Sequence, residues 1–425
     1  MTMLLYNLLW PVGLLVFMPG FLLKMFRRGG YRKNFSQRLG FYSAEIRQRL
    51  RNQRPVWMHA VSVGEVMIAL KLARQLRALR PDMHCALTTT TTTGYALAQR
   101  SAPEWMTVLY TPLDFLPIMR NAFGAISPRQ IVLTEAEVWP NLVSEAHRRK
   151  IPVAVANARL SPRSERKFLR FRFVLGQIFG KLNLLCVPEP ADAERWRCIG
   201  AQQDRIRVVG NIKFDPEERH TASFDPCRFL EQIGTDPARL ILLGGSTHRG
   251  EEAILLDAFI ELREEFTGLF LIIAPRHAER AGEIESLLRA RGLRAARRSR
   301  AGETSPEVLL IDTTGELADW YRVATVVFIG KSMTARGGQN PVEALVAGKP
   351  VIFGPHMENF AALSRQLLEQ RGAVCARNVN ELIASARELL RDAELREALV
   401  ARASSVLAQH RDATARTAEL ISALG

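Results

Sequence analysis

Charged residues that could do chemistry stand directly after apolar segments of this sequence. The segment SVGE, residues 62–65, follows the apolar run 55–61, and helical periodicity begins at Glu65. The helix dipole favours an ionised carboxylate in the first helical turn, and such a carboxylate can take a proton from an attacking hydroxyl. Glu65 is therefore a candidate general base. Judged by position alone, simple helix capping explains Glu65 better, and that alternative stays open.

Two further segments have residues that suit phosphates or nucleotides. Pro275 and Arg276 follow the apolar run 269–274, and an arginine at a strand end suits bidentate phosphate recognition. Surface solvation of the arginine is the alternative. In DTTGELADWY, residues 312–321, a turn leads into a helix whose first amides could hold a base or a phosphate. The residues of that turn are Thr314, Gly315 and Glu316.

The most specific segment is GKSMTARGGQNPVEALVAGKPVIFGP, residues 330–355. A strand ends at its first glycine, a glycine-containing loop follows, and a helix begins near Pro341, because proline suits the first helical position. A glutamate in that first turn can accept both hydroxyls of a ribose, and helix capping is the alternative. The residues at this helix start are Asn340, Pro341, Val342 and Glu343.

The spacing of other residues excludes several classes of site. The glycine-containing segment GGSTHRGEE, residues 244–252, is neither a P-loop nor a dinucleotide-binding fingerprint, which removes the main support for an ATPase or a dehydrogenase. No cluster of ligand residues has metal-site spacing. We therefore expect no metal and no cofactor, and we expect cations and helix N-termini to meet the charge of a leaving group.

A basic stretch, SPRSERKFLRFR at residues 161–172, lies at another expected junction of strand and helix. Its cations could hold the phosphates of an acceptor, or they could form an ordinary solvated helix face, and both interpretations stay open. The candidate acceptor-binding residues are Arg163, Arg166 and Lys167.

The elements that would position these residues alternate between strands and helices. Apolar runs without clean alternation, separated by helical segments, indicate parallel sheets covered on both faces. The pattern of strand, glycine turn, acid and helix occurs twice, and 425 residues leave room for two domains. We therefore expect an α/β fold of two facing Rossmann-like domains, with the ligand site in the cleft between them. The expected boundaries are 1–26 for a membrane anchor, 27–54 for a basic connector, 55–210 for the first domain, 211–238 for a linker and 239–425 for the second domain.

The N-terminus combines an apolar segment with a basic one. Residues 1–23 carry no charge, and about 20 helical residues span a bilayer. A basic block follows, and the whole chain has a net charge of +15. This order favours an anionic membrane over nucleic acid, for which no aromatic-interleaved basic motif is present. The positive-inside tendency places the domains in the cytoplasm; Pro11 and Pro19 leave a monotopic anchor open.

The segments, taken in order, resemble the 3-deoxy-D-manno-octulosonic acid (Kdo) transferases. The matching segments are RKNFSQRLGFY, HAVSVGE, YTPLD, LTEAEVWPNL, PVAVANARLS, GNIKFD, APRH, TGEL, GGQNPVEA and VIFGPHMENF. The resemblance implies an inverting, metal-independent GT-B glycosyltransferase of lipopolysaccharide synthesis on the cytoplasmic side of the inner membrane. It would move Kdo from CMP-Kdo to the phosphorylated lipid A precursor, lipid IVA.

The resemblance also implies roles for single residues. Glu65 stands where the family has its base, and Glu137 falls in a family motif without an assigned role. The positions that would hold CMP are Pro275, Arg276, Thr314, Gly315, Glu316, Asn340, Pro341, Val342 and Glu343.

The chain departs from the family pattern at two places, and two other functions stay open. Lys331 stands where many relatives have glycine, which adds a cation near the expected phosphate site, and Gln339 stands where they have histidine. A GT-B transferase that uses a UDP-sugar and a lipid acceptor is the enzymatic alternative. An inactive, membrane-tethered transferase fold that only binds lipopolysaccharide intermediates is the alternative of another class.

Overall fold

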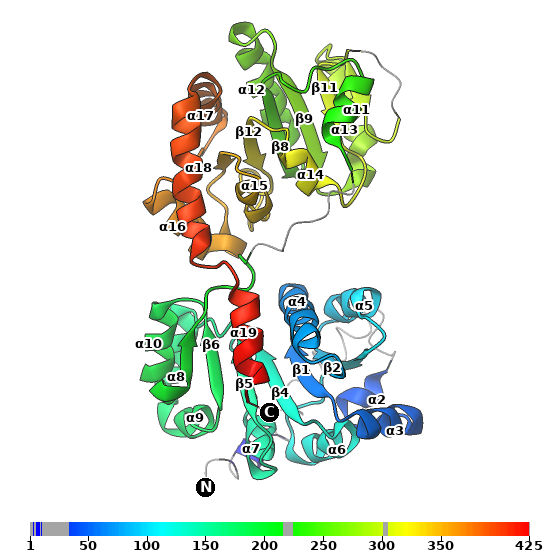
Figure 1. Cartoon of the computed structure of the whole chain (residues 1–425), viewed down its shortest axis with the longest axis vertical. Helices are drawn as coiled ribbons and strands as arrows, with labels where there is room; N and C mark the ends of the chain where they lie inside the picture. Colours follow the sequence, from blue (N-terminus) through cyan, green and yellow to red (C-terminus); the bar gives the residue numbers. More distant parts are fainter. Residues whose placement is uncertain are drawn as a thin grey trace. The chain divides into compact units, whose positions relative to one another are not determined.

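The computed structural model describes residues 3, 6–8, 10, 34–215, 224–300 and 305–424. The chain divides into two compact units, each built on one parallel sheet (Figure 1). The α/β class expected from the sequence is therefore confirmed. Unit 1 comprises Met1–Asp215 and Asp412–Gly425, and unit 2 comprises Pro216–Arg411.

The sheet of unit 1 has the strand order β3-β2-β1-β4-β5-β6-β7, and every pairing is parallel. Most of its strands are apolar and buried along their length, because helices cover both faces. The strand order reverses between β1 and β4, so the loops after these strands lie together at the edge where ligands bind in such sheets. The strands are β1 (Val56–Ala60), β2 (Cys85–Thr89), β3 (Met106–Tyr110), β4 (Gln130–Thr134), β5 (Val153–Ala156), β6 (Leu184–Val187) and β7 (Ile206–Val208).

Two hydrophobic cores lie on the two faces of this sheet. Trp57 of β1 packs in one core with Phe123, and the next residue, Met58, packs in the other core with Leu72. Successive side chains of one strand thus reach opposite helical layers. The helices are α2 (Phe35–Arg38), α3 (Ala44–Gln53), α4 (Val63–Leu79), α5 (Thr92–Ser101), α6 (Leu116–Ile126), α7 (Pro140–Arg148), α8 (Pro162–Arg170), α9 (Arg172–Phe179), α10 (Pro190–Cys198), η1 (Gln203–Arg205) and α19 (Ala413–Ser422).

The C-terminal helix α19 belongs to unit 1, which departs from the expected second domain of 239–425. Ile421 is buried in the core that contains α4, and Gln130 Nε2 donates a hydrogen bond of 2.7 Å to its carbonyl oxygen. Asp215 accepts from the backbone N–H of Thr414 at 2.8 Å. An amphipathic pattern predicts a helix but does not say which core the helix covers, so the prediction assigned α19 to its neighbour in sequence.

Unit 2 has a second parallel sheet, with the strand order β10-β11-β9-β8-β12-β13-β14. The order reverses between β8 and β12, which pair directly. The two edge strands β10 and β14 escaped prediction, as did β7 in unit 1, because β7 and β10 each contain an arginine and β14 has only two residues. The strands are β8 (Ile241–Thr247), β9 (Phe270–Pro275), β10 (Ala295–Arg297), β11 (Val308–Leu310), β12 (Val326–Ile329), β13 (Val351–Phe353) and β14 (Val374–Cys375).

The core of unit 2 forms where the helices α12 and α17 meet the sheet, with Leu255, Phe259 and Leu389 fully buried beside Phe328 of β12. The helices are α11 (Pro226–Gln232), α12 (Glu251–Glu265), η2 (Ala278–Arg280), α13 (Ala281–Ala290), α14 (Leu317–Tyr321), α15 (Val342–Val346), η3 (Glu358–Phe360), α16 (Ala361–Glu369), α17 (Val379–Arg391) and α18 (Ala393–Ala408).

Only part of the expected N-terminal anchor and connector is among the described residues. Across residues 3, 6–8, 10, 34–215, 224–300 and 305–424, no helix has the length and apolarity of a membrane span. The expected anchor at 1–26 lies mostly outside the described residues, and so does 27–33 of the expected connector. The remainder of that connector is part of folded unit 1: Gln37 accepts from the N–H of Tyr110, and the Arg38 guanidinium lies 4.2 Å from the centre of the Tyr110 ring.

The expected linker at 211–238 is likewise mostly folded. Ile212 and Phe214 are buried in unit 1, and α11 packs in unit 2 through Phe229 and Leu230. Residues 216–223 lie outside the described residues.

Candidate active site

Glu65 lies in the first turn of α4, directly after β1, at the ligand-binding edge of the unit 1 sheet. Its side chain is 7% exposed, and its carboxylate accepts from the backbone N–H of Val61 and from the hydroxyl of Ser62, each at 2.8 Å. Ser62 in turn accepts from the N–H of Glu65, which completes a capping box. The capping alternative is therefore present in the structure, and it holds the carboxylate in one position at this edge.

Two more glutamates follow β4, the strand on the other side of the order reversal. Glu135 has a φ of +55°, in a left-handed region that is uncommon for glutamate and that concentrates at functional sites. Burial and then the charge of Glu65 raise the pKa of Glu135. Burial, Glu65 and Glu135 raise the pKa of Glu137 to about 7. The three glutamates are therefore one cluster of interacting carboxylates.

Cations offset the charge of this cluster unevenly. Arg159 and Lys213 lower the pKa of Glu135, against the effect of its burial, while no cation acts on Glu137 in the same way. Burial and the two neighbouring carboxylates therefore raise the pKa of Glu137 without an opposing cation among the described residues. Sequence reasoning noted Glu137 only through the family motif and missed Glu135, although both directly follow an apolar strand.

The basic helix α8 follows β5, the neighbour of β4, at the same edge of the sheet. Phe171 and Phe173, just beyond α8, are 57% and 83% exposed. Arg163 is in the first turn of α8, and its side chain lies outside the described part of the chain. A cavity of about 540 Å³ is lined by Arg166, Lys167, Arg170 and Phe171. Two of the three predicted acceptor-binding residues thus share one cavity with an exposed aromatic ring.

The predicted CMP-binding residues all lie at the carboxyl edge of the unit 2 sheet. Pro275 ends β9, and the N–H of Arg276 donates to the carbonyl oxygen of Thr247, at the end of β8, at 3.0 Å. The Arg276 side chain is exposed and makes no ion pair with any other described residue. Arg276 is therefore available to an anion.

The turn after β11 places its three predicted residues differently. Thr314 is exposed, and Gly315 has a φ of +92°. The carboxylate of Glu316 is bound by Arg298 through two hydrogen bonds of 2.9 and 3.1 Å, and the Arg298 guanidinium also lies 4.1 Å from the centre of the Phe224 ring. Glu316 thus stabilises the turn, while Thr314 and Gly315 form its accessible part.

The remaining predicted residues lie between β12 and α15. Asn340 Oδ1 accepts from the N–H of Val342 at 3.1 Å, and α15 begins at Val342, one residue later than the proline start predicted. Pro341 and Val342 are buried, whereas Glu343 is exposed in the first turn. Burial and then the charge of Glu343 raise the pKa of Tyr321, so the two side chains are electrostatically close.

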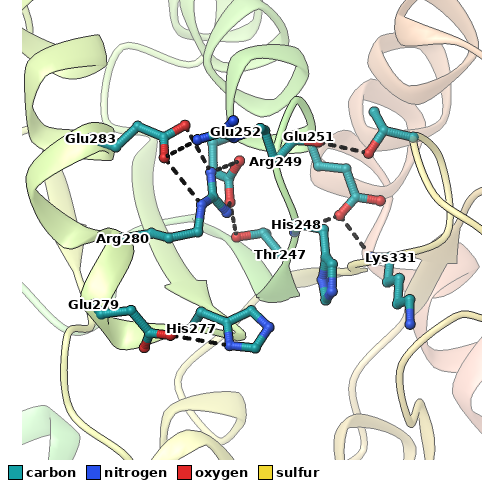
Figure 2. Close-up of polar contacts among 11 residues, drawn as sticks. Thr247, His248, Arg249, Glu251, Glu252, His277, Glu279, Arg280, Glu283 and Lys331 are labelled. Carbon is teal, nitrogen blue, oxygen red and sulfur yellow. Dashed lines mark hydrogen bonds and ion pairs between the residues drawn. The ribbon is translucent and has the colours of Figure 1, made fainter. Parts of the chain in front are cut away.

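Glu251, which sequence reasoning did not single out, joins the loops after β8 and β12 (Figure 2). Its buried carboxylate accepts from the backbone N–H groups of His248, Lys331, Ser332 and Met333 at 2.7–2.9 Å. The loops approach so closely that a Cβ on Gly330 would clash with the carbonyl oxygen of Ser246. The available signal was the same as for Glu65: an acid in the first helical turn after a strand.

Basic side chains gather beside this junction. The rings of His248 and His277 lie 5.7 Å apart, and Figure 2 shows His248 and Lys331 pointing to the same side. His248 Nδ1 is buried and has no hydrogen-bond partner among the described residues. Burial, with smaller contributions from the charges of Lys331 and His277, lowers the pKa of His248. With Arg276 nearby in the fold, this group suits an anionic ligand.

Solved structures of similar fold define the class of the protein. The UDP-GlcNAc 2-epimerase of Neisseria meningitidis bound to UDP-GlcNAc is 15% identical, with a TM-score of 0.57 over 87% of this chain and 99% of that chain. A glycotransferase of kitacinnamycin is 17% identical, with a TM-score of 0.52 over 87% and 98%. At these identities the likeness shows the fold alone. The two Rossmann-like units are of the GT-B type, as expected.

Sequence relatives then define the family. A family model described as 3-deoxy-D-manno-octulosonic-acid transferase (kdotransferase) matches residues 33–216. The 3-deoxy-D-manno-octulosonic acid transferases of Haemophilus influenzae and Bordetella pertussis are 31% and 32% identical, over 92% and 86% of this chain and 91% and 86% of theirs. The chain belongs to the Kdo transferase family and is a glycosyltransferase, which confirms the resemblance of its motifs.

Proposed function

We propose that the protein transfers Kdo from CMP-Kdo to the phosphorylated lipid A precursor, lipid IVA, with inversion at the anomeric carbon. Membership of the Kdo transferase family supports the transferred sugar. The observation that carries the mechanism is the buried Glu65 carboxylate, held by Val61 and Ser62 within a three-carboxylate cluster at the ligand-binding edge of unit 1.

The chemistry assigned to unit 1 is proton removal. Glu65 takes the proton from the acceptor hydroxyl while the hydroxyl oxygen attacks the anomeric carbon of Kdo, and the bond from that carbon to the CMP phosphate breaks with its electrons leaving on CMP. Glu137, with a pKa of about 7, accepts the proton from Glu65 and returns the base to its charged form. General-base help of this kind contributes about 10²–10⁴ in rate.

The donor nucleotide is assigned to the carboxyl edge of unit 2. Arg276 and Lys331 contact the phosphate, whose charge grows as the bond breaks. Glu343, exposed in the first turn of α15, accepts from the ribose hydroxyls. The backbone of Thr314 and Gly315 contacts the base. This assignment uses this chain's own cations and requires no metal.

The acceptor is assigned to the surface of α8 and the start of α9. The positive charges of Arg166 and Lys167 suit the phosphates of the lipid A precursor. The neighbouring rings of Phe171 and Phe173 are exposed, as aromatic side chains that insert into a membrane surface are. Basic residues beside exposed aromatics favour an anionic bilayer. We place the protein on the inner membrane, with both units on the cytoplasmic side and the anchor within residues 1–26. The described residues Tyr6 and Asn7 of this segment donate hydrogen bonds to Asp114 and Asn141 of unit 1.

The test is Kdo transfer by the full chain, followed by mass spectrometry of lipid IVA after incubation with CMP-Kdo. The Glu65→Gln variant keeps the shape of the capping box but removes the base, so kcat should fall about 10²-fold or more. Glu381→Gln is the matched control, because Glu381 and Asn378 form the same kind of capping box at α17. Equal activity of the Glu65→Gln and Glu381→Gln variants contradicts the assigned base.

The donor is tested separately by competition. CMP should inhibit transfer and UDP should not, because the proposal assigns the unit 2 edge to a cytidine nucleotide. Inhibition by UDP alone, with no mass increase from CMP-Kdo, overturns the proposed donor and supports the UDP-sugar alternative.

A further inference from the structure

A second basic cavity of unit 2 lies at the edge of the sheet opposite to the candidate nucleotide site. Its volume is about 470 Å³, and its walls come from the segments that precede β8, β12 and β13 and from α18. In a parallel sheet these are the amino ends of the strands, whereas Arg276 and Lys331 follow carboxyl ends. Among the described residues, the cations that line the cavity are Arg239, Arg322, Lys349 and Arg396, and the one acid is Glu397.

These four cations make no ion pair with any residue in the described part of the chain. The neighbouring α17 differs, because its Arg391 is paired with Glu265 of α12. Two of the four are instead fixed by backbone carbonyls. Arg239 Nε donates to the oxygen of Gly268 at 2.7 Å, and Arg396 Nη1 donates to the oxygen of Leu389 at 2.6 Å. Backbone carbonyls therefore hold both guanidinium groups in place, and each group keeps further N–H donors that can bind a ligand.

Lys349 is a partly buried cation among the residues that line this cavity. Its side chain is half-buried between Gly348 and Pro350, and burial lowers its pKa. An ammonium removed from water without a carboxylate partner costs free energy. A cation at a helix C-terminus gains from the helix dipole, which accounts for Arg322 at the end of α14. It does not account for Arg239, which precedes a strand.

We propose that this cavity binds a phosphate-bearing anion at a site separate from the candidate nucleotide site. Four cations against one acid match a ligand with more than one negative charge, and the arginine fork binds phosphate oxygens in pairs. The cavity is large enough for a diphosphate. Because Arg239 and Arg396 are already ordered, binding loses little side-chain entropy. Free diphosphates and the headgroups of anionic lipids share this chemistry.

The experiment is isothermal titration of the full chain with inorganic pyrophosphate, with the nucleotide edge disabled by Arg276→Ala in every protein used. Against that background, Arg239→Gln with Lys349→Gln should weaken pyrophosphate binding about 100-fold, since each lost contact to a charged group is worth about 10-fold. The matched control is Arg377→Gln with Arg402→Gln, which removes two charges from exposed positions of the same unit and should change nothing. Thermal melts must show that all variants fold.

A parallel arm identifies the source of the phosphate. Each protein is sedimented with vesicles of phosphatidylcholine and phosphatidylglycerol. Weaker binding of the cavity variant alone to pyrophosphate supports a soluble anion, and weaker binding of that variant alone to vesicles supports a lipid headgroup. Equal binding of the cavity and control variants to both probes overturns the proposal.

Discussion

Replacing Glu137 by glutamine tests the carboxylate cluster of unit 1 through stability, independently of any substrate. Burial and the charges of Glu65 and Glu135 raise the pKa of Glu137 from the ordinary 4.5 to about 7. The folded protein therefore binds this proton more tightly than the unfolded chain does. The resulting stabilisation is fully present below about pH 4.5 and is lost as the pH rises through about 7.

The size of the effect follows from the shift in pKa. A difference of about 2.5 pKa units corresponds to about 3 kcal/mol at 1.36 kcal/mol per unit. We reduce this free energy to about 2 kcal/mol, because the carboxylates of the cluster titrate together and because Glu137 is partly exposed. At pH 8 the Glu137→Gln variant, which lacks the repelled charge, should exceed the natural protein in stability by that amount. A gain of about 2 kcal/mol raises the Tm of a unit of this size by about 4–8 °C.

Thermal melts at pH 5, 6, 7 and 8 measure this difference. The gain in Tm of Glu137→Gln should be near zero at pH 5 and should grow between pH 6 and pH 8. Glu104→Gln is the control, since Glu104 is an exposed glutamate of the same unit, and its Tm difference should not change with pH. If Glu137→Gln loses stability at pH 8 relative to pH 5, hydrogen bonds to the charged carboxylate outweigh the repulsion, and the cluster as argued does not exist.

Two further predictions concern the junction of β8 and β12 in unit 2. Lys331→Gly should weaken CMP binding by about 10-fold, because it removes one charged contact. The Tm should stay unchanged or rise, because Lys331 has a φ of +54° that favours glycine. If a CMP titration gives the natural protein and the variant equal affinity, the assigned phosphate contact is contradicted. Gly330→Ala should destabilise unit 2 by about 1–3 kcal/mol, because the added Cβ would clash with the carbonyl oxygen of Ser246. An unchanged denaturant midpoint for that variant shows that the two loops are free to separate.

The fold could be predicted wherever an apolar run was long enough to be distinguished from the helical segments on either side of it. The central strands β1, β4, β8 and β12 are such runs, and they gave both sheets and the α/β class. The short edge strands gave no signal, because β7 and β10 each contain an arginine and β14 has only two residues. Helix α19 was predicted as a helix, but the unit against which it packs was not. Its contact with unit 1 depends on partners such as Gln130, which lie far away in the sequence.

The candidate site could be predicted to the level of the strand end and no further. The rule that ligands bind after the carboxyl ends of parallel strands placed Glu65, Arg276 and Asn340 at the right edges of their sheets. It did not reveal that Arg298 donates two hydrogen bonds to the carboxylate of Glu316. It also missed the electrostatic coupling that raises the pKa of Glu137. Both effects come from side chains that meet only in the folded unit.

Glu65 and Glu251 show why local pattern alone does not separate a base from a structural residue. Each is an acid in the first turn of a helix that follows a central strand at the order reversal of its sheet. A carboxylate has about four acceptor positions. Those of Glu251 are filled by four backbone N–H groups from two loops, so it fixes the loops and has no position left for a substrate proton.

The acceptor positions of Glu65 are only partly used. One backbone N–H and one hydroxyl donate to it at 2.8 Å, and Thr134 Oγ1, at 3.3 Å from Glu65, also donates to the carbonyl oxygen of His59 at 2.8 Å. A position therefore remains on Glu65 for an incoming hydroxyl. Two further carboxylates, Glu135 and Glu137, lie within electrostatic reach of Glu65. The count of donors, which only the folded chain supplies, supports the proposal of a base at Glu65 and of a structural role for Glu251.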